Sequence, residues 1–166
     1  MKENLTKLFE EYVNEASTQD LEVLQHVLKG LQKKQKESDT YSYIEGLLQM
    51  NGVKNGNTVE ITVPLNPLFN NPLNILHGGV IATVIDSTMG AIIYSTLPKG
   101  SIAVTQQLNI HYVAPGIGEY ITCKAKIDHH GTQTMVVSAE IFRGDGIKVA
   151  QASGSFFLIK DKTLNR

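Results

Sequence analysis

A single carboxylate lies inside the most apolar stretch of the chain. Between Gly78 and Pro98 the only residue with a formal charge is Asp86. A buried carboxylate is costly unless it has a bonding partner or a chemical task. Asp86 could take a proton from water or attack an electrophilic carbon itself. The structural alternative is a buried Asp86 that is hydrogen-bonded to the backbone or to Thr83.

Two glycines, Gly78 and Gly79, open the same stretch directly after His77. If a helix begins there, the first N–H groups have no acceptor within the helix. Together with the helix dipole they could hold the negative charge that develops on the oxygen of an ester or thioester carbonyl. Glycine lets a ligand approach closely because it has no Cβ. The alternative is an ordinary glycine entry into a helix.

The spacing of these groups predicts an assembly. Gly78 and Asp86 are eight residues apart, about 12 Å along a helix, so one carbonyl carbon is hard to reach from both. Two antiparallel copies of the helix could pair Gly78 of one chain with Asp86 of another, which predicts at least a homodimer. The residues that share the helix face of Asp86 are small, which leaves room for a substrate beside Gly79 and Thr83.

The elements that must position these residues follow from hydrophobic periodicity. The segment from about Gly78 to Tyr94 is apolar nearly all round and predicts a helix that is covered on most sides. Strands are expected over 43–53 and 57–64, around the turn KNGN, and near 102–112, 118–129, 132–143 and 147–160. Connections of hairpin length favour antiparallel pairing. The sequence therefore predicts an α+β fold in which one curved antiparallel sheet wraps one long helix.

The strand expected at 102–112 has two different faces if it alternates without a break. One face would carry the apolar side chains, and the other would carry Ala103, Thr105, Gln107, Asn109 and His111. Cys123 alternates with core residues of a later strand, so we expect it to be buried and inert.

The first forty residues have the hydrophobic periodicity of helices. Apolar residues recur at helical spacing over 3–15 and again after Ser17 or Thr18, which can cap a second helix. This second helix ends in Lys33, Lys34 and Lys36, a basic stretch that suits the negative end of the helix dipole. We expect a helical hairpin over residues 1–40 and a main domain over 41–166. The lysines are either a solvated helix end or a phosphate-binding patch.

The composition excludes several classes of protein. A chain of 166 residues with 42% hydrophobic and 19% charged residues is typical of a globular protein, and a net charge of −1 gives no reason to expect nucleic-acid binding. One cysteine permits no internal disulfide, which fits a cytoplasmic location. The N-terminus has no apolar signal core, and the stretch around Asp86 suits a buried helix better than a membrane span.

Two motifs carry a family resemblance. Residues 71–90 match N-x-x-N-x-L-H-G-G-V-x-A-T-x-x-D-x-x-M-G, and residues 103–112 match A-V-T-x-x-L-N-I-x-Y. Over residues 43–160 the chain resembles the hotdog-fold acyl-CoA thioesterases of the phenylacetate-degradation (PaaI-like) type. This resemblance implies a hotdog fold and the hydrolysis of acyl-CoA thioesters to free acid and CoA, with no cofactor besides the CoA of the substrate.

The resemblance also implies roles for individual residues. Asp86 would be the catalytic general base or nucleophile, and the Gly78 N–H would polarise the thioester carbonyl. Asn71 would position the substrate or the attacking water, His77 would shape the loop, and Thr105 would be a small hydroxyl residue near the nucleophile. In the family, the acid and the glycine come from different subunits of a dimer, often within a tetramer.

The sequence departs from the family pattern at two positions. Asn74 stands where many members have glycine, which concerns the shape of the loop. Gln107 stands where many members have an acid, which concerns the far wall of the site, and we expect it to contact the substrate. Neither departure affects the pairing of Gly78 with Asp86.

Other functions fit the sequence less well. A non-catalytic acyl-CoA-binding regulator would gain little from Asp86, and the acids of the N-terminal region disfavour DNA binding. A hydratase of the same fold pairs histidine with an acid at another spacing than that of His77 and Asp86. Five histidines and one cysteine without an H-x-x-x-H motif predict no metal site. Aryl, medium-chain and branched acyl groups all remain open.

Overall fold

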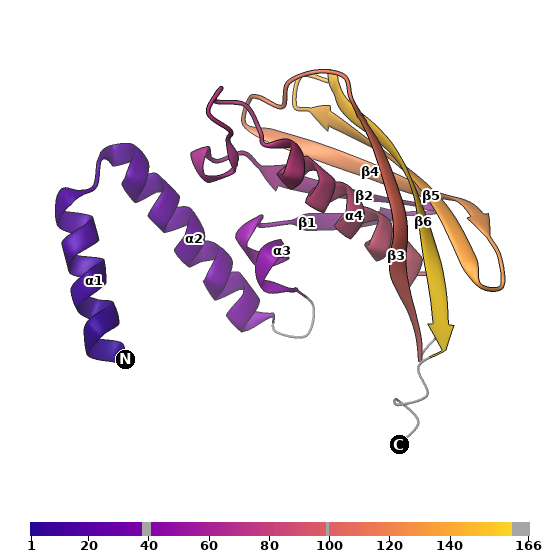
Figure 1. Ribbon diagram of the computed structural model, residues 1–166, viewed down its shortest axis with the longest axis horizontal. Coiled ribbons are helices and arrows are strands. Elements are labelled where there is room, and N and C mark those ends of the chain that lie inside the picture. Colours follow the sequence, from indigo (N-terminus) through magenta and orange to yellow (C-terminus); the bar gives the residue numbers. More distant parts are fainter. Residues whose placement is uncertain (38–40, 99, 161–166) are drawn as a thin grey trace. The chain divides into compact units, whose positions relative to one another are not determined.

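The computed structural model describes residues 1–37, 41–98 and 100–160. These residues form two compact units. One unit contains the described residues up to 49 together with 66–68, and the other contains 50–65 together with those from 69 onward. Figure 1 labels the helices and strands of both.

The first unit is helical, as the sequence predicts for its first part. It contains α1 (Lys2–Glu15), α2 (Thr18–Lys36) and the short α3 (Tyr43–Leu47). Ser17 caps α2: its Oγ accepts from the N–H of Asp20 at 3.2 Å, and the Asp20 carboxylate accepts from the N–H of Ser17 at 3.0 Å. The Ser17 hydroxyl also donates to the Asp20 carboxylate at 2.6 Å, and this bond, together with the one from the Ser17 N–H, holds the pKa of Asp20 below its usual value.

The strand expected over 43–53 is wrong in its first half, because residues 43–47 form α3. A second capping box begins this helix. Ser42 Oγ accepts from the N–H of Glu45, and the Glu45 carboxylate accepts from the N–H of Ser42 at 2.7 Å. Local side-chain bonds thus favour a helical turn here, and the first strand begins only at Asn51.

The second unit is built on one antiparallel sheet that curves around a helix (Figure 1). Hydrogen bonding orders its strands β1-β2-β4-β5-β6-β3, so β1 and β3 are the edges. The strands are β1 (Asn51–Asn55), β2 (Thr58–Pro64), β3 (Ser101–Tyr112), β4 (Tyr120–His130), β5 (Thr134–Arg143) and β6 (Lys148–Lys160). The predicted order of two strands, one helix and four strands, and the predicted α+β fold, are confirmed.

Helix α4 (Gly78–Tyr94) supplies one side of the core. It packs on β2, β3, β4, β5 and β6, and a 3₁₀ turn at Pro67–Phe69 lies in the chain before it. Its fully buried side chains include Val84, Ile85, Met89 and Ile93. Strands β2 and β5 bury alternate residues. Gly154 of β6 permits close contact, since a Cβ there would lie 2.8 Å from Met89 Sδ.

Cys123 lies in this core with no exposed surface. Its burial raises the pKa of the thiol to about 12, against a smaller lowering by a hydrogen bond with Thr88. The thiol therefore stays protonated at neutral pH, in agreement with the inert role predicted from the sequence.

A β-bulge changes the face that β3 presents to α4. Thr105 pairs with Phe156, whereas Gln107 pairs with Ser155. Because Phe156 and Ser155 point to opposite faces of β6, Thr105 and Gln107 also point to opposite faces. Thr105 lies on the α4 side with the buried Phe156, and Gln107 lies on the outer side.

The uninterrupted alternation predicted for 102–112 is therefore wrong. Before the bulge, Val104 pairs with Phe157 on the outer face. After it, Leu108 pairs with Gly154 on the α4 face. Because of the extra residue at the bulge, odd-numbered residues face α4 before it, and even-numbered residues face α4 after it.

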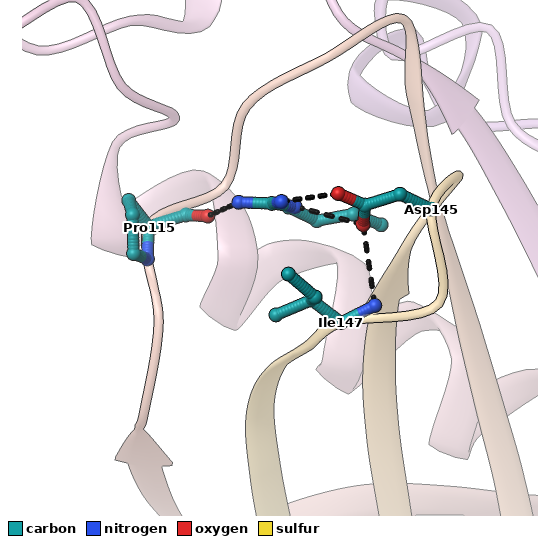
Figure 2. Close-up of polar contacts among 4 residues, drawn as sticks. Pro115, Asp145 and Ile147 are labelled. Carbon is teal, nitrogen blue, oxygen red and sulfur yellow. Dashed lines mark hydrogen bonds and ion pairs between the residues drawn. The ribbon is translucent and has the colours of Figure 1, made fainter.

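The turn between β5 and β6 is tied to the loop that follows β3 (Figure 2). Arg143 donates through Nε to Asp145 Oδ1 at 3.0 Å, donates through Nη2 to Oδ2, and reaches the carbonyl of Pro115 at 3.5 Å. Asp145 Oδ1 also accepts from the N–H of Ile147 at 3.2 Å. The hydrogen bonds from Arg143 and from the Ile147 N–H lower the pKa of Asp145.

None of the helices in the described ranges combines the length and the apolar character that a membrane span needs.

Candidate active site

His77 is the N-cap of α4 and accepts hydrogen bonds from most of the N–H groups at the start of that helix. Its Nδ1 accepts from the N–H of Gly79 at 2.9 Å, and its carbonyl accepts from Val80 and Ile81 at 2.9 and 3.1 Å. The N–H of His77 itself donates to the carbonyl of Phe69 at 2.8 Å. Because Nδ1 is an acceptor, the ring proton of neutral His77 lies on Nε2.

One donor at this helix start is left over. Within residues 1–37, 41–98 and 100–160, no group accepts from the N–H of Gly78. Gly79, which the sequence also offered as a donor, is occupied by His77. An unpaired N–H at a helix N-terminus is suited to an incoming carbonyl oxygen or anion. Of the two glycines, Gly78 is thus the one whose N–H has no acceptor among the described residues.

Asp86 lies two turns further along α4 and is half-buried. The hydroxyl of Thr105, on β3, donates to Asp86 Oδ1 at 2.8 Å. The bulge after Thr105 is what keeps this residue on the α4 side of the sheet. Thr83, which could have paired with Asp86, donates instead to the carbonyl of Gly79 at 3.0 Å. The carboxylate is thus oriented by a residue from another element.

The loop before α4 is folded by its own asparagines. Asn71 Oδ1 accepts from the N–H of Leu73 at 2.9 Å, and the Asn71 carbonyl accepts from the N–H of Asn74 at 2.9 Å. Asn74 has a φ of +57°, the left-handed conformation that glycine and asparagine adopt most readily. This explains how asparagine can stand where the family resemblance led us to expect glycine.

Tyr112, which was not among the predicted site residues, contacts the start of α4. Its hydroxyl donates to the carbonyl of Gly78 at 3.0 Å, and its ring would lie 3.5 Å from a Cβ at that position. The signal was present, because Tyr112 closes the second motif of the resemblance. Together, Tyr112 and Thr105 attach α4 to the edge strand β3 at two points.

The predicted site residues fall into three places. Asn71, His77, Gly78 and Gly79 lie at or just before the start of α4. Asp86 lies about 12 Å from Gly78 along the same helix, and Thr105 of β3 is hydrogen-bonded to it. Gln107 lies on the outer face of the sheet, away from Asp86, because of the bulge.

The outer face of the sheet carries a hollow of its own, about 860 Å³ in volume. Its lining is mixed and includes Gln107, Lys124 and Glu140 as well as Val136 and Ala139. Gln107 places this hollow on the face of the sheet away from α4. Among the described residues, no cluster of three histidine, cysteine or acidic side chains could hold a metal ion.

One family model matches this chain. The family model described as "Thioesterase superfamily" matches residues 73–150, which include both Gly78 and Asp86. The crystal structure of the BH2602 protein from Bacillus halodurans, solved with CoA, is 39% identical to this chain. That similarity has a TM-score of 0.83 and covers 89% of this chain and 98% of that one.

Two further proteins are less similar. A Saccharolobus solfataricus protein, whose name gives esterase as an unproven activity, is 30% identical over 102 residues, or 61% of this chain and 72% of that protein. The PaaI protein of Escherichia coli, from the phenylacetic acid degradation operon, shares the fold. It is 21% identical with a TM-score of 0.67, covering 80% of this chain and 95% of that one.

Proposed function

This chain belongs to the thioesterase superfamily and has the hotdog fold, and we propose that it hydrolyses acyl-CoA thioesters to the free acid and CoA. Family membership supports thioester hydrolysis in general. The CoA-type substrate is our inference from the relative solved with CoA, which is 39% identical over almost its whole length. The proposed reaction consumes water and needs no metal or redox cofactor.

The pairing of Asp86 with Thr105 is the observation that carries the proposal. The hydroxyl of Thr105 occupies Asp86 Oδ1, and Oδ2 has no partner among the described residues. A half-buried, oriented carboxylate with one free oxygen can accept a proton from water or attack a carbonyl carbon. The small neighbours of Asp86 on α4 leave space for an acyl group.

We assign the carbonyl oxygen of the thioester to the N–H of Gly78. When water or Asp86 adds to the carbonyl carbon, negative charge develops on that oxygen, and a fixed N–H at a helix start stabilises it. The CoA thiolate then leaves and takes up a proton. If Asp86 attacks, an acyl–aspartyl anhydride forms first, and water hydrolyses it in a second step.

Both groups can serve one thioester only if they come from two copies of the chain. Within one copy they are separated by about 12 Å of helix. Strand β3 is a twelve-residue edge, which can pair with another chain. Since β3 also carries Thr105 and Tyr112, a copy joined there would bring its own α4 close to Asp86. We therefore propose a homodimer joined at β3 as the active unit.

The decisive experiment compares two carboxylate-to-amide variants. Asp86→Asn should lower kcat on acyl-CoA thioesters by about 100-fold or more, the usual contribution of a general base. Asp128→Asn changes an exposed acid that pairs with Lys126 at 3.6 Å, and should leave kcat unchanged. A panel of aryl-, medium-chain and branched acyl-CoAs gives the substrate class in the same assay.

Two outcomes of this experiment separate the alternatives. If the parent chain binds acyl-CoA but releases no CoA from any member of the panel, a non-catalytic acyl-CoA-binding protein replaces the proposal. If Asp86→Asn keeps full turnover, the family activity stands and Asp86 loses its role.

If Asp86→Asn loses turnover, single-turnover hydrolysis by the parent chain in ¹⁸O-water distinguishes general-base from nucleophilic catalysis by Asp86. Only an anhydride intermediate can leave solvent oxygen in the Asp86 carboxylate.

A further inference from the structure

Helix α1 carries an apolar stripe that the described chain does not cover. Leu5, Leu8, Phe9 and Tyr12 recur at helical spacing and are 65%, 63%, 43% and 44% exposed, and no residue of α1 is buried. A helix of this length is marginal in water by itself and is normally stabilised by packing of its apolar face. The stripe therefore indicates a contact with residues outside the first unit.

Helix α2 has one covered face and one open face. The covered face meets α3, where His26 Nε2 lies 2.8 Å from the carbonyl of Leu47 and a Cβ on Gly30 would lie 2.7 Å from the carbonyl of Gly46. At about 100° per residue, a second stripe lies on the opposite side of α2. It consists of Leu21, Leu24, Leu28 and Leu31.

Acidic side chains gather at the end of α1 and the start of α2, and basic side chains gather at the end of α2. Helix α1 ends in Glu10, Glu11 and Glu15, and α2 begins with Asp20 and Glu22. The end of α2 carries only basic charges: Lys29, Lys33, Lys34 and Lys36. In an antiparallel hairpin with a two-residue connection, the acidic end of α1 lies beside the acidic start of α2. Like charges at these positions oppose closure of the hairpin on itself.

We propose that the helical hairpins of two copies of this chain associate into an antiparallel four-helix bundle. In this arrangement a two-fold axis crosses the helices, so that α1 of one copy runs parallel to α2 of its partner. The leucine stripes then face the bundle interior, as in known bundles built from hairpins. The acidic end of each α1 lies beside the basic end of the partner's α2.

A second copy is the partner that these charges specify. A two-fold interface must be complementary to itself, which requires one chain to carry both members of each pair. This hairpin does so, because its acids and its lysines lie at the matching ends of α1 and α2. The proposal does not depend on thioester hydrolysis or on pairing at β3.

The first test changes the stripe without touching a buried residue. Leu5→Glu places a charge at the N-terminal end of the stripe, and Asn14→Glu places the same charge on the opposite side of α1. We expect Leu5→Glu to weaken self-association by about tenfold or more, because the bundle interior would then have to bury a charge. Asn14→Glu should leave it unchanged. Sedimentation velocity over a concentration series measures both, with circular dichroism as the check that helices persist.

The second test exchanges charges between helices. One variant carries Glu11→Lys and Glu15→Lys, and the other carries Lys29→Glu and Lys36→Glu. Each should self-associate more weakly than the parent chain. Mixed together they should form hetero-assemblies in preference to either homo-assembly, because opposite charges again meet between copies. Native mass spectrometry of the mixture reads out all three species.

Three results would overturn the bundle. They are a parent chain whose mass is the same as that of Leu5→Glu at every concentration, an equal effect of Asn14→Glu, and random mixing of the two charge variants. Raising the salt concentration should weaken the preference for hetero-assembly, since exposed charges are screened.

Discussion

Asp86 is held in place by a single donated hydrogen bond, and this bond is the most direct point at which the proposed catalysis can be changed. The donor, Thr105, belongs to β3, whereas the acceptor belongs to α4. A bond from a hydroxyl to a charged group typically contributes about 1.5–3 kcal/mol. The geometry of Asp86 therefore depends on a residue that would not itself react.

Replacing Thr105 should separate orientation from binding. Thr105→Val keeps the shape of the side chain but removes the donor, so we expect kcat to fall by about tenfold or more with little change in KM. Thr105→Ser restores the hydroxyl and should restore most of kcat. A purely structural role would be indicated if valine were tolerated and serine were not.

Much of the candidate site could be predicted residue by residue. Asp86 stands out as the only charge in an apolar helix, and the motifs point to Thr105 and His77. Tyr112 ends the second motif, but its contact was missed because its bond is to the backbone carbonyl of Gly78, and the residue types alone do not specify a backbone acceptor. The role of Gly79 was also hidden, since its N–H is occupied by the ring of His77.

The crossing of α2 and α3 is the closest contact between elements in the first unit. Gly30 and Gly46 face each other there, and a Cβ on Gly30 would lie 2.7 Å from both the Gly46 carbonyl oxygen and Leu47 Cα. Both atoms belong to the backbone, which cannot turn aside as a side chain can. The two helices must separate if either glycine gains a side chain.

Two glycine-to-alanine changes should therefore have opposite effects. Gly30→Ala should destabilise the α2–α3 contact by about 1–3 kcal/mol through overpacking. Gly90→Ala, inside α4, meets no atom within 4 Å and should stabilise the fold by about 0.4–1 kcal/mol. Urea unfolding followed by circular dichroism, with hydrogen exchange of α2 and α3, measures both. Equal destabilisation by the two changes would contradict this account.

At the scale of elements, the sequence predicted most of the sheet and all three long helices. Strong periodicity and clear turn residues made this possible, as at Gly56, where a φ of +59° forms the turn between β1 and β2. The failures have local causes. A capping box between Ser42 and Glu45 turned an expected strand into α3, and the bulge in β3 was not predicted from the alternation alone.

At the scale of the whole molecule, acid should affect the second unit through the turn between β5 and β6. Asp145 has a lower pKa in the folded chain than when unfolded, because of its bonds to Arg143 and to the Ile147 N–H. Such a group stabilises the folded state fully above its unfolded pKa of about 3.9, and the stabilisation disappears as the pH falls through the lower folded value.

The melting temperature of Asp145→Asn gives the corresponding prediction. The parent chain should melt at a higher temperature than the variant between about pH 5 and 7, where an aspartate is ionised. This difference should shrink progressively below about pH 4. A difference that grows as the pH falls would show that Asp145 is not ionised in its bond with Arg143.

The bulge in β3 also has a genetic consequence. One extra residue between Thr105 and Gln107 lets Thr105 and Tyr112, which are seven residues apart, both face α4. Removal of the codon for that extra residue, Gln106, would leave an unbroken strand, in which Thr105 and Tyr112 are six residues apart and still face α4. Removal of a codon in the middle of β5, which pairs regularly, would instead turn half of that strand to the other face of the sheet. Among in-frame deletions in the sheet, we therefore expect loss of the codon at the bulge to be tolerated best.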